Sequence, residues 1–147
     1  MNLATVACDG ESCEEDIRAQ VLDARAELEI GEQQLSAEVA TTEVELERGW
    51  KHRRCDLDGL LLIAPDNGEL SLWGCGLREA VDVHWIRDDQ VLATLSSLEP
   101  CAEPCDACPI AGAGEPVDAA LEVPHGALEV SPGDVVAGLA SWLPGAP

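Results

Sequence analysis

Short alternating segments separated by turn signals constrain the fold of this chain more than any other feature. Apolar side chains alternate with glutamates along Ala26–Ile30, and a similar alternation returns along Leu35–Val39. Gly31-Glu32 lies between the two segments, where a turn is needed. This pattern predicts a β-hairpin with one buried face and one solvated face.

The middle of the chain predicts a second pair of strands. Gly59–Ala64 is a continuous apolar run, which is typical of a strand buried on both faces. Pro65–Gly68 is a strong turn signal because Asn and Gly tolerate positive φ. We therefore expect Glu69–Trp73 to return as a strand after that turn.

The rest of the chain predicts more short strands and one long loop. In Val81–Ile86 the odd-numbered side chains should face one side of a strand, and the even-numbered ones, which include Asp82 and His84, should face the other. Glu99–Glu115 is rich in Cys, Pro and Gly and is long for a loop in a compact domain. The remaining segments predicted to be strands are Val91–Leu98, Val117–Val123 and Val135–Ala137.

Two capping boxes predict short helices. Ser12-Cys13-Glu14-Glu15 has Ser at the N-cap and Glu three residues later, and it predicts a helix over about Cys13–Ala24. Thr42-Glu43-Val44-Glu45 has the same form and predicts a helix of barely two turns, which Gly49 ends.

Together these patterns predict an all-β protein, with a single sandwich or barrel-like domain of short, mostly antiparallel strands and one or two short helices. The 147 residues suit one domain plus an extension. We expect residues 1–23 to form an acidic N-terminal extension, residues 24–140 the domain, and residues 141–147 a frayed tail.

The formal net charge of −21 bears on partners. It argues against nucleic acid binding and favours a soluble monomer. The acidic surface could bind a basic protein partner, or it could serve only to keep the protein solvated. Arg48–Arg54 holds four of the eight basic residues, so it is either an anion site or a group that neutralises nearby carboxylates.

The chain shows no run of about 18 apolar residues, so no membrane span is expected. Met1–Ala7 lacks the basic and apolar regions of a signal peptide, which makes a cytoplasmic location the default. The protein would instead be exported if a leader peptide has been removed from this sequence.

Seven cysteines are many for this length, and the spacing of three of them is the sharpest local signal. Cys101, Cys105 and Cys108 lie within eight residues and could converge on zinc, with Cys55, Cys75, His52 or His84 as the fourth ligand. A disulfide within the loop, or free thiols, is the alternative. Cys8 and Cys13 could likewise be bonded to each other or remain two separate surface thiols.

Catalysis has little support in the sequence, which contains no nucleophile elbow, phosphate loop, dinucleotide fingerprint or His-Glu-x-x-His motif. Asp82 and His84 share a strand face and could form an acid–base pair. Cys75, between two glycines, could be a redox thiol if its pKa were lowered.

The order of several motifs resembles the bacterial and archaeal family called domain of unknown function 192. The resemblance rests on Glu38-Val39-Ala40-Thr41, Asp58–Leu62, Val81–Ile86, the Cys-Pro loop at 99–109, and Leu121–Gly126 followed by Pro132–Val135. It covers about Ala24–Ala137 and implies a small all-β domain, but no established function. The chain departs from the family at Gly74–Leu77, where a polar Met-Lys-Asn-Thr run is usual.

We therefore predict a small, soluble, all-β binding or accessory module that is non-catalytic. It would act through a surface pocket or edge near Trp73, Cys75, Asp82 and His84. The alternative is a metal- or thiol-dependent protein, with zinc as the candidate cofactor, that uses Cys101, Cys105 and Cys108.

Overall fold

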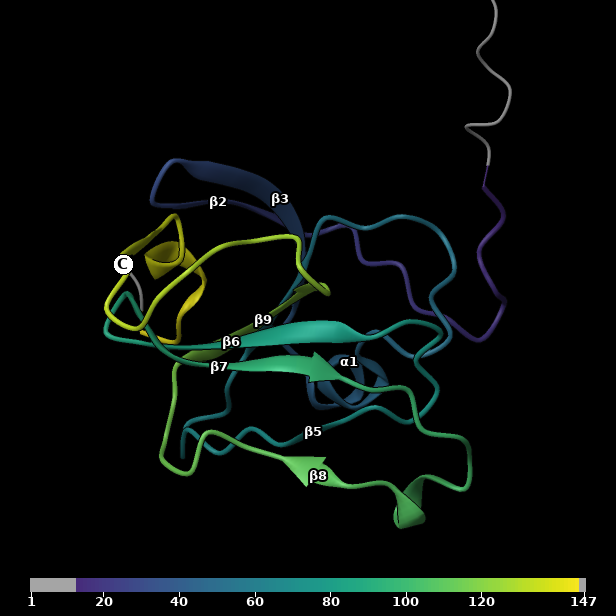
Figure 1. The fold of residues 1–147 in the computed structure, drawn as a ribbon. Helices are drawn as coiled ribbons and strands as arrows, with labels where there is room; N and C mark the ends of the chain where they lie inside the picture. The colour runs from purple at the N-terminus through teal and green to yellow at the C-terminus, as the bar shows by residue number, and fades with distance from the viewer. Residues whose placement is uncertain (1–12, 146–147) are drawn as a thin grey trace, which may run out of the picture.

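A computed structural model describes residues 13–145 and shows a curled, mixed sheet of seven strands in the order β10-β2-β3-β4-β9-β6-β7 (Figure 1). A separate two-stranded sheet joins β5 to β8. The strands are β2 (Arg25–Ile30), β3 (Gln33–Ala40), β4 (Leu60–Ile63), β5 (Leu72–Trp73), β6 (Val81–Arg87), β7 (Gln90–Leu98), β8 (Ile110–Ala111), β9 (Ala119–Pro124) and β10 (Val136–Ala137). The helices are α1 (Glu43–Arg48) and the 3-10 turns η2 (Cys105–Ala107) and η3 (Ala140–Trp142).

The predicted all-β class is confirmed, and so are several of its elements. β2 and β3 form the expected antiparallel hairpin, with Ile30 opposite Gln33 across the Gly31-Glu32 turn. β4 is buried along its whole length because it lies inside the sheet, parallel to β3 and antiparallel to β9. α1 begins at the predicted capping box, in which the Glu45 amide donates to the Thr42 hydroxyl.

The prediction that Glu69–Trp73 returns as a partner of the Gly59–Ala64 strand is wrong. Both edges of β4 are already occupied, by β3 and by β9. The chain therefore leaves the main sheet after the turn at 65–68, and Leu72–Trp73 pairs instead with β8 from the long loop.

The helix predicted over Cys13–Ala24 is also wrong for the residues that the structure describes. Ile17 is 98% exposed and Val21 is 58% exposed, so the apolar repeat buries little surface that could stabilise so short a helix. Glu15, the expected capping residue, accepts a hydrogen bond from Arg53 Nε instead. Ser12, the expected N-cap, lies outside the described residues.

The sheet has a packed cluster of side chains on each face. One face carries a core that includes Leu28, Leu61 and Leu121. The other face carries Leu60, Val83 and Trp85 and is covered by α1 and the β5–β8 pair, which Figure 1 shows on the same side of the sheet. Within residues 13–145, no helix is long and apolar enough to cross a membrane.

Candidate binding pocket

A pocket of about 240 Å³ opens on the covered face of the sheet. Its walls are mostly apolar and come from α1 and the turn after it, from β5 and from β8. The apolar lining residues are Leu46, Trp50, Leu72, Trp73, Leu77 and Ile110. The charged lining residues are Glu47, Arg48, Lys51 and Glu122, of which Glu122 alone comes from the main sheet.

The wall that carries Trp50 is fixed by the ends of α1. Gly49 closes the helix at a φ of 48°, in the left-handed region that favours glycine. Gln20 Nε2 donates to the carbonyl oxygens of Glu45 and Gly49, at 2.8 and 3.1 Å. The Glu45 carbonyl also accepts the Gly49 amide at 2.9 Å, so Gln20 adds a second bond at the end of the helix and helps to position the turn that carries Trp50.

The opposite wall is fixed by the cysteine-rich loop. Trp73 lies opposite Ile110 in the β5–β8 pair. A disulfide joins Cys75 to Cys105, and a second joins Cys101 to Cys108. The loop therefore holds β5 by cross-links as well as by backbone hydrogen bonds.

Close packing beside Trp73 explains why Gly74 stands at the start of the segment that departs from the usual Met-Lys-Asn-Thr run of the family. A Cβ atom added at Gly74 would collide with the carbonyl oxygen of Glu99. The Gly74 carbonyl accepts a hydrogen bond from Cys101 N at 2.9 Å. Glycine is needed here because two backbones lie in contact.

Glu122 is the unusual group of the pocket. It is only 3% exposed, and its Oε1 atom has no hydrogen-bond partner within residues 13–145. Burial raises the pKa of Glu122 to about 8. A carboxyl group with a pKa of about 8 is predominantly the neutral acid at pH 7.

A second buried glutamate lies in the same row of the sheet. Glu38 on β3 is level with Leu60 on β4, and Leu60 is level with Glu122 on β9. Residues level with one another on adjacent strands point to the same face, so both glutamates face the covered side. Glu38 is fully buried.

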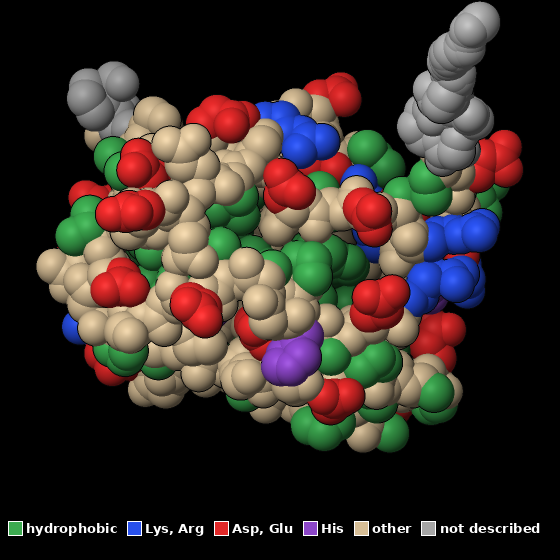
Figure 2. Space-filling model, turned by 45° about the horizontal axis from the view of Figure 1, so that its top comes forward, with side chains coloured by type: hydrophobic (Ala, Val, Ile, Leu, Met, Phe, Trp, Pro, Cys, Tyr) green, Lys and Arg blue, Asp and Glu red, His purple; other side chains and the backbone are tan. Residues whose placement is uncertain are grey.

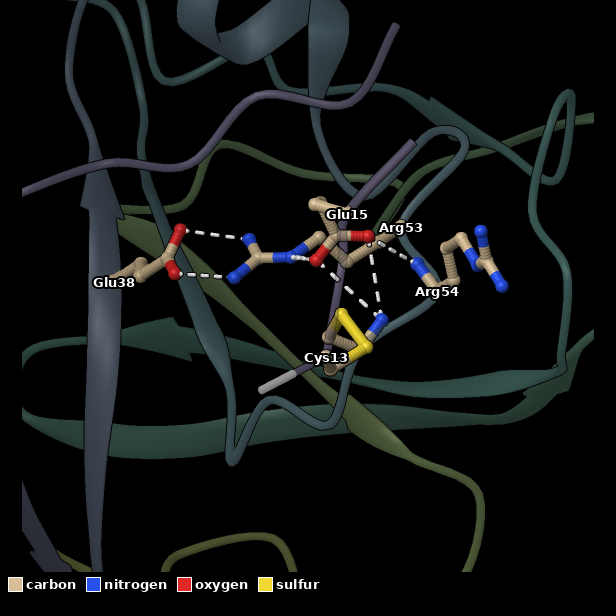
Figure 3. Close-up of a disulfide and its surroundings, with 6 residues drawn as sticks. Cys13, Glu15, Glu38, Arg53 and Arg54 are labelled. Carbon is tan, nitrogen blue, oxygen red and sulfur yellow. Dashed lines mark hydrogen bonds and ion pairs between the residues drawn. A yellow bond between two sulfur atoms is a disulfide. The ribbon is translucent and has the colours of Figure 1, made fainter. Parts of the chain in front are cut away.

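Glu38, unlike Glu122, is fully paired. Arg53 Nη1 and Nη2 donate to its two oxygens at 2.9 and 2.7 Å, and the Leu22 amide donates at 3.0 Å. Figure 3 shows the Arg53 guanidinium between the carboxylates of Glu38 and Glu15. The side-chain hydrogen bonds to Glu38 raise the pKa of Arg53 although burial opposes the shift.

The N-terminal segment holds this ion pair in place. Cys13 forms a disulfide with Cys55, so both alternatives considered for Cys13, a bond to Cys8 and a free surface thiol, are wrong. Cys8 lies outside the described residues. The cross-link keeps Glu15 beside Arg53, where the Cys55 amide also donates to it at 3.2 Å.

Among the predicted binding residues, the pocket includes Trp73 but not Cys75, Asp82 or His84. Cys75 is fully buried and has no free thiol, because it is bonded to Cys105. Asp82 and His84 alternate with Val83, which lies opposite Glu122, so they point to the other face of β6.

Asp82 and His84 do not form the acid–base pair considered above. Asp82 accepts hydrogen bonds from the Ser97 and Gly126 amides and contacts His125 Nδ1, at 2.8 to 2.9 Å. Burial raises the pKa of Asp82, but these three contacts outweigh burial and lower it overall. His84 contacts Thr94 Oγ1 through Nδ1 at 2.8 Å, and burial lowers its pKa.

The three loop cysteines are all in disulfides. Cys101 and Cys108 are bonded within the loop, and Cys105 is bonded to Cys75. Zinc binds thiolates, so zinc binding at these residues would require the two disulfides to be reduced.

Two pocket residues, Glu122 and Trp50, were missed as site residues in the sequence. Glu122 sits at an alternating position of a strand, Val117–Val123, and such a position usually faces water. A strand that pairs with the apolar run Gly59–Ala64 would have both faces covered, which would bury Glu122. The sequence does not show which strands pair, so this could not be predicted.

Comparison with known proteins identifies a family but no activity. The model of the family domain of unknown function 192, described as "Uncharacterized ACR", matches residues 26–138. No curated protein matches the chain.

Two crystal structures resemble the fold. A candidate transcription regulator from Sinorhizobium meliloti 1021 is 23% identical, with a TM-score of 0.70, over 82% of this chain and 98% of that one. A protein of unknown function from Novosphingobium aromaticivorans DSM 12444 is 18% identical, with a TM-score of 0.65, over 90% and 99%. At these identities the likeness concerns the fold alone.

Proposed function

We propose, from the premise that this chain belongs to the domain of unknown function 192 family, that it is a non-catalytic module which binds a small, largely apolar ligand. The ligand site is the pocket between α1, β5 and β9. Because the family carries no assigned activity, the proposal depends on the pocket itself.

The buried carboxyl of Glu122 is the observation that carries the proposal. A buried polar atom without a partner is costly, and native proteins leave few of them. Here the atom belongs to a residue that lines a mostly apolar pocket, whose lining also includes Trp50 and Trp73. Mostly apolar walls with a few polar groups at fixed places are typical of small-molecule sites.

We also infer an oxidising compartment for this module. Three disulfides link Cys13 to Cys55, Cys75 to Cys105 and Cys101 to Cys108. Structural disulfides persist outside reducing cytosol and are rare within it. Two of the three hold the loop that forms a pocket wall, so we assign them a structural role rather than a redox or metal-binding one.

Binding of tert-butylbenzene, a small uncharged aromatic, tests the proposal. We expect it to shift the NMR signals of the Trp50 and Trp73 indole N–H groups in a saturable way. A Ser71→Trp substitution at the exposed rim of the pocket should block this binding, whereas Ser96→Trp, exposed on β7 away from the pocket, should not. Equal binding by the two variants would locate the ligand elsewhere.

A further inference from the structure

Glu38 and Glu122 lie on either side of Leu60 in one row of the sheet, and both carboxyl groups are buried. They differ in whether the chain gives them a charged partner. At Glu38 the chain supplies its own organic cation, the Arg53 guanidinium, with both carboxylate oxygens bonded. At Glu122, within the described residues, the chain supplies none.

The two cations that line the pocket do not serve Glu122. The Lys51 ammonium lies 3.6 Å from the sulfur of Cys105, on the loop side of the pocket. Within residues 13–145, neither Lys51 nor Arg48 forms an ion pair with Glu122, whose Oε1 atom has no hydrogen-bond partner. Any cation that pairs with this carboxylate must therefore come with the ligand.

We propose that the pocket binds an organic ammonium ion with an apolar body, with the Glu122 carboxylate as its counter-ion and Trp50 and Trp73 as its aromatic walls. This inference rests on the proposed function, because it names the ligand class of the same pocket.

Three physical effects favour a cation over a neutral molecule or an anion. A buried carboxylate is strongly disfavoured until an opposite charge pairs with it. Tryptophan is the aromatic side chain whose ring face attracts cations best. The formal net charge of −21 concentrates cations around the protein, and Figure 2 shows acidic side chains spread over the displayed face.

Binding has a defined proton balance. The neutral acid of Glu122 releases its proton to solvent as the ammonium ion enters, and no covalent bond forms or breaks. Affinity for a cation that cannot itself titrate should therefore rise between pH 6 and pH 9. The other charged groups that line the pocket are Glu47, Arg48 and Lys51.

The test compares three probes of similar shape on the full chain: phenyltrimethylammonium, its uncharged carbon counterpart tert-butylbenzene, and benzoate. At pH 8 we expect phenyltrimethylammonium to bind about tenfold or more tightly than tert-butylbenzene. The Glu122→Gln variant should lose this preference and keep its affinity for tert-butylbenzene. Glu43→Gln, exposed on α1 and outside the pocket lining, is the matched control and should keep the preference and its pH profile.

The outcomes separate the two proposals. If tert-butylbenzene binds as tightly as phenyltrimethylammonium, or if benzoate binds best, the ammonium inference is wrong. The proposal that the pocket binds a small ligand is then still supported. If no probe binds, the proposed function itself fails. A thermal melt establishes that Glu122→Gln is folded, and the pH profile of the wild-type protein decides the inference without any variant.

Discussion

Glu38 and Glu122 flank Leu60 in one row of the sheet, yet the chain treats them in opposite ways. Glu38 receives a two-pronged bond from Arg53 and a bond from a backbone amide. Glu122 has an orphan oxygen beside a pocket. The difference indicates that a buried acid can hold the fold together when its partner is built in, and can serve a ligand when its partner is absent.

The largest effect should follow from removing the partner of Glu38. Arg53→Met removes the two short bonds to the fully buried Glu38 carboxylate and leaves it only the Leu22 amide and a longer contact, 3.8 Å, with Arg25 Nη2. We expect the free energy of unfolding to fall by roughly 3 to 5 kcal/mol. Chemical denaturation measures it. Arg54→Met is the matched control, because its exposed side chain points away from the pair in Figure 3, and it should change stability by less than about 0.5 kcal/mol. Similar losses in the two variants would show that the Glu38 pair is unimportant.

The next effect concerns the cross-link that keeps Glu15 beside Arg53. Replacing both Cys13 and Cys55 with Ser removes a disulfide with a sequence separation of 42. We expect a loss of about 2 to 4 kcal/mol, chiefly because the unfolded chain gains freedom. Denaturation of the double variant measures the loss, and an intact mass of the unreduced wild-type protein, short by two hydrogens per disulfide, is the control. Unchanged stability would show that the Cys13–Cys55 disulfide does not stabilise the fold.

Glu122→Gln should have a smaller effect that depends on pH. The folded protein keeps the Glu122 proton up to about pH 8, whereas an unfolded glutamate releases it near 4.5. Unfolding therefore releases a proton between these values, and this group lowers the free energy of unfolding as pH rises. From pH 6 to pH 8 the wild-type protein should lose about 2 kcal/mol relative to Glu122→Gln. Parallel stability curves for the two proteins would show that Glu122 is not buried as a neutral acid.

The smallest effect is expected at Asp82, a third buried acid whose partners are mainly backbone amides. The hydrogen bond to Asp82 raises the pKa of His125, so its contribution is complete below pH 6.5 and disappears as pH rises past the raised pKa. His125→Gln should therefore lower the melting temperature slightly at pH 5.5 and not at pH 9. An NMR titration of the His125 ring measures the shift, and a loss that grows with pH would have the wrong sign.

Local patterns predicted the parts of the fold that local chemistry decides. The Thr42 capping box and the Gly31-Glu32 hairpin are confirmed because neighbouring residues alone satisfy their bonds. The partner of β5 could not be predicted in this way, because β8 lies more than 30 residues along the chain and the free edge depends on the whole sheet.

The candidate site was predicted only in part for the same reason. Trp73 was selected and lines the pocket, but Glu122 was taken as one member of an alternating strand. Whether an acidic residue in a strand meets water, an arginine or a pocket is decided by tertiary packing. Cys75 was considered a redox thiol because it lies between two glycines, and its bond to Cys105, 30 residues away, could not be predicted from that local pattern.

A carbon-13 NMR titration of the Glu122 side-chain carboxyl, with and without saturating phenyltrimethylammonium, tests the central claim most directly. We predict a pKa of about 8 for Glu122 in the free protein and a clearly lower pKa in the complex, because the bound cation stabilises the carboxylate. An ordinary glutamate pKa in the free protein, or a raised pKa that the saturating cation leaves unchanged, would contradict the account.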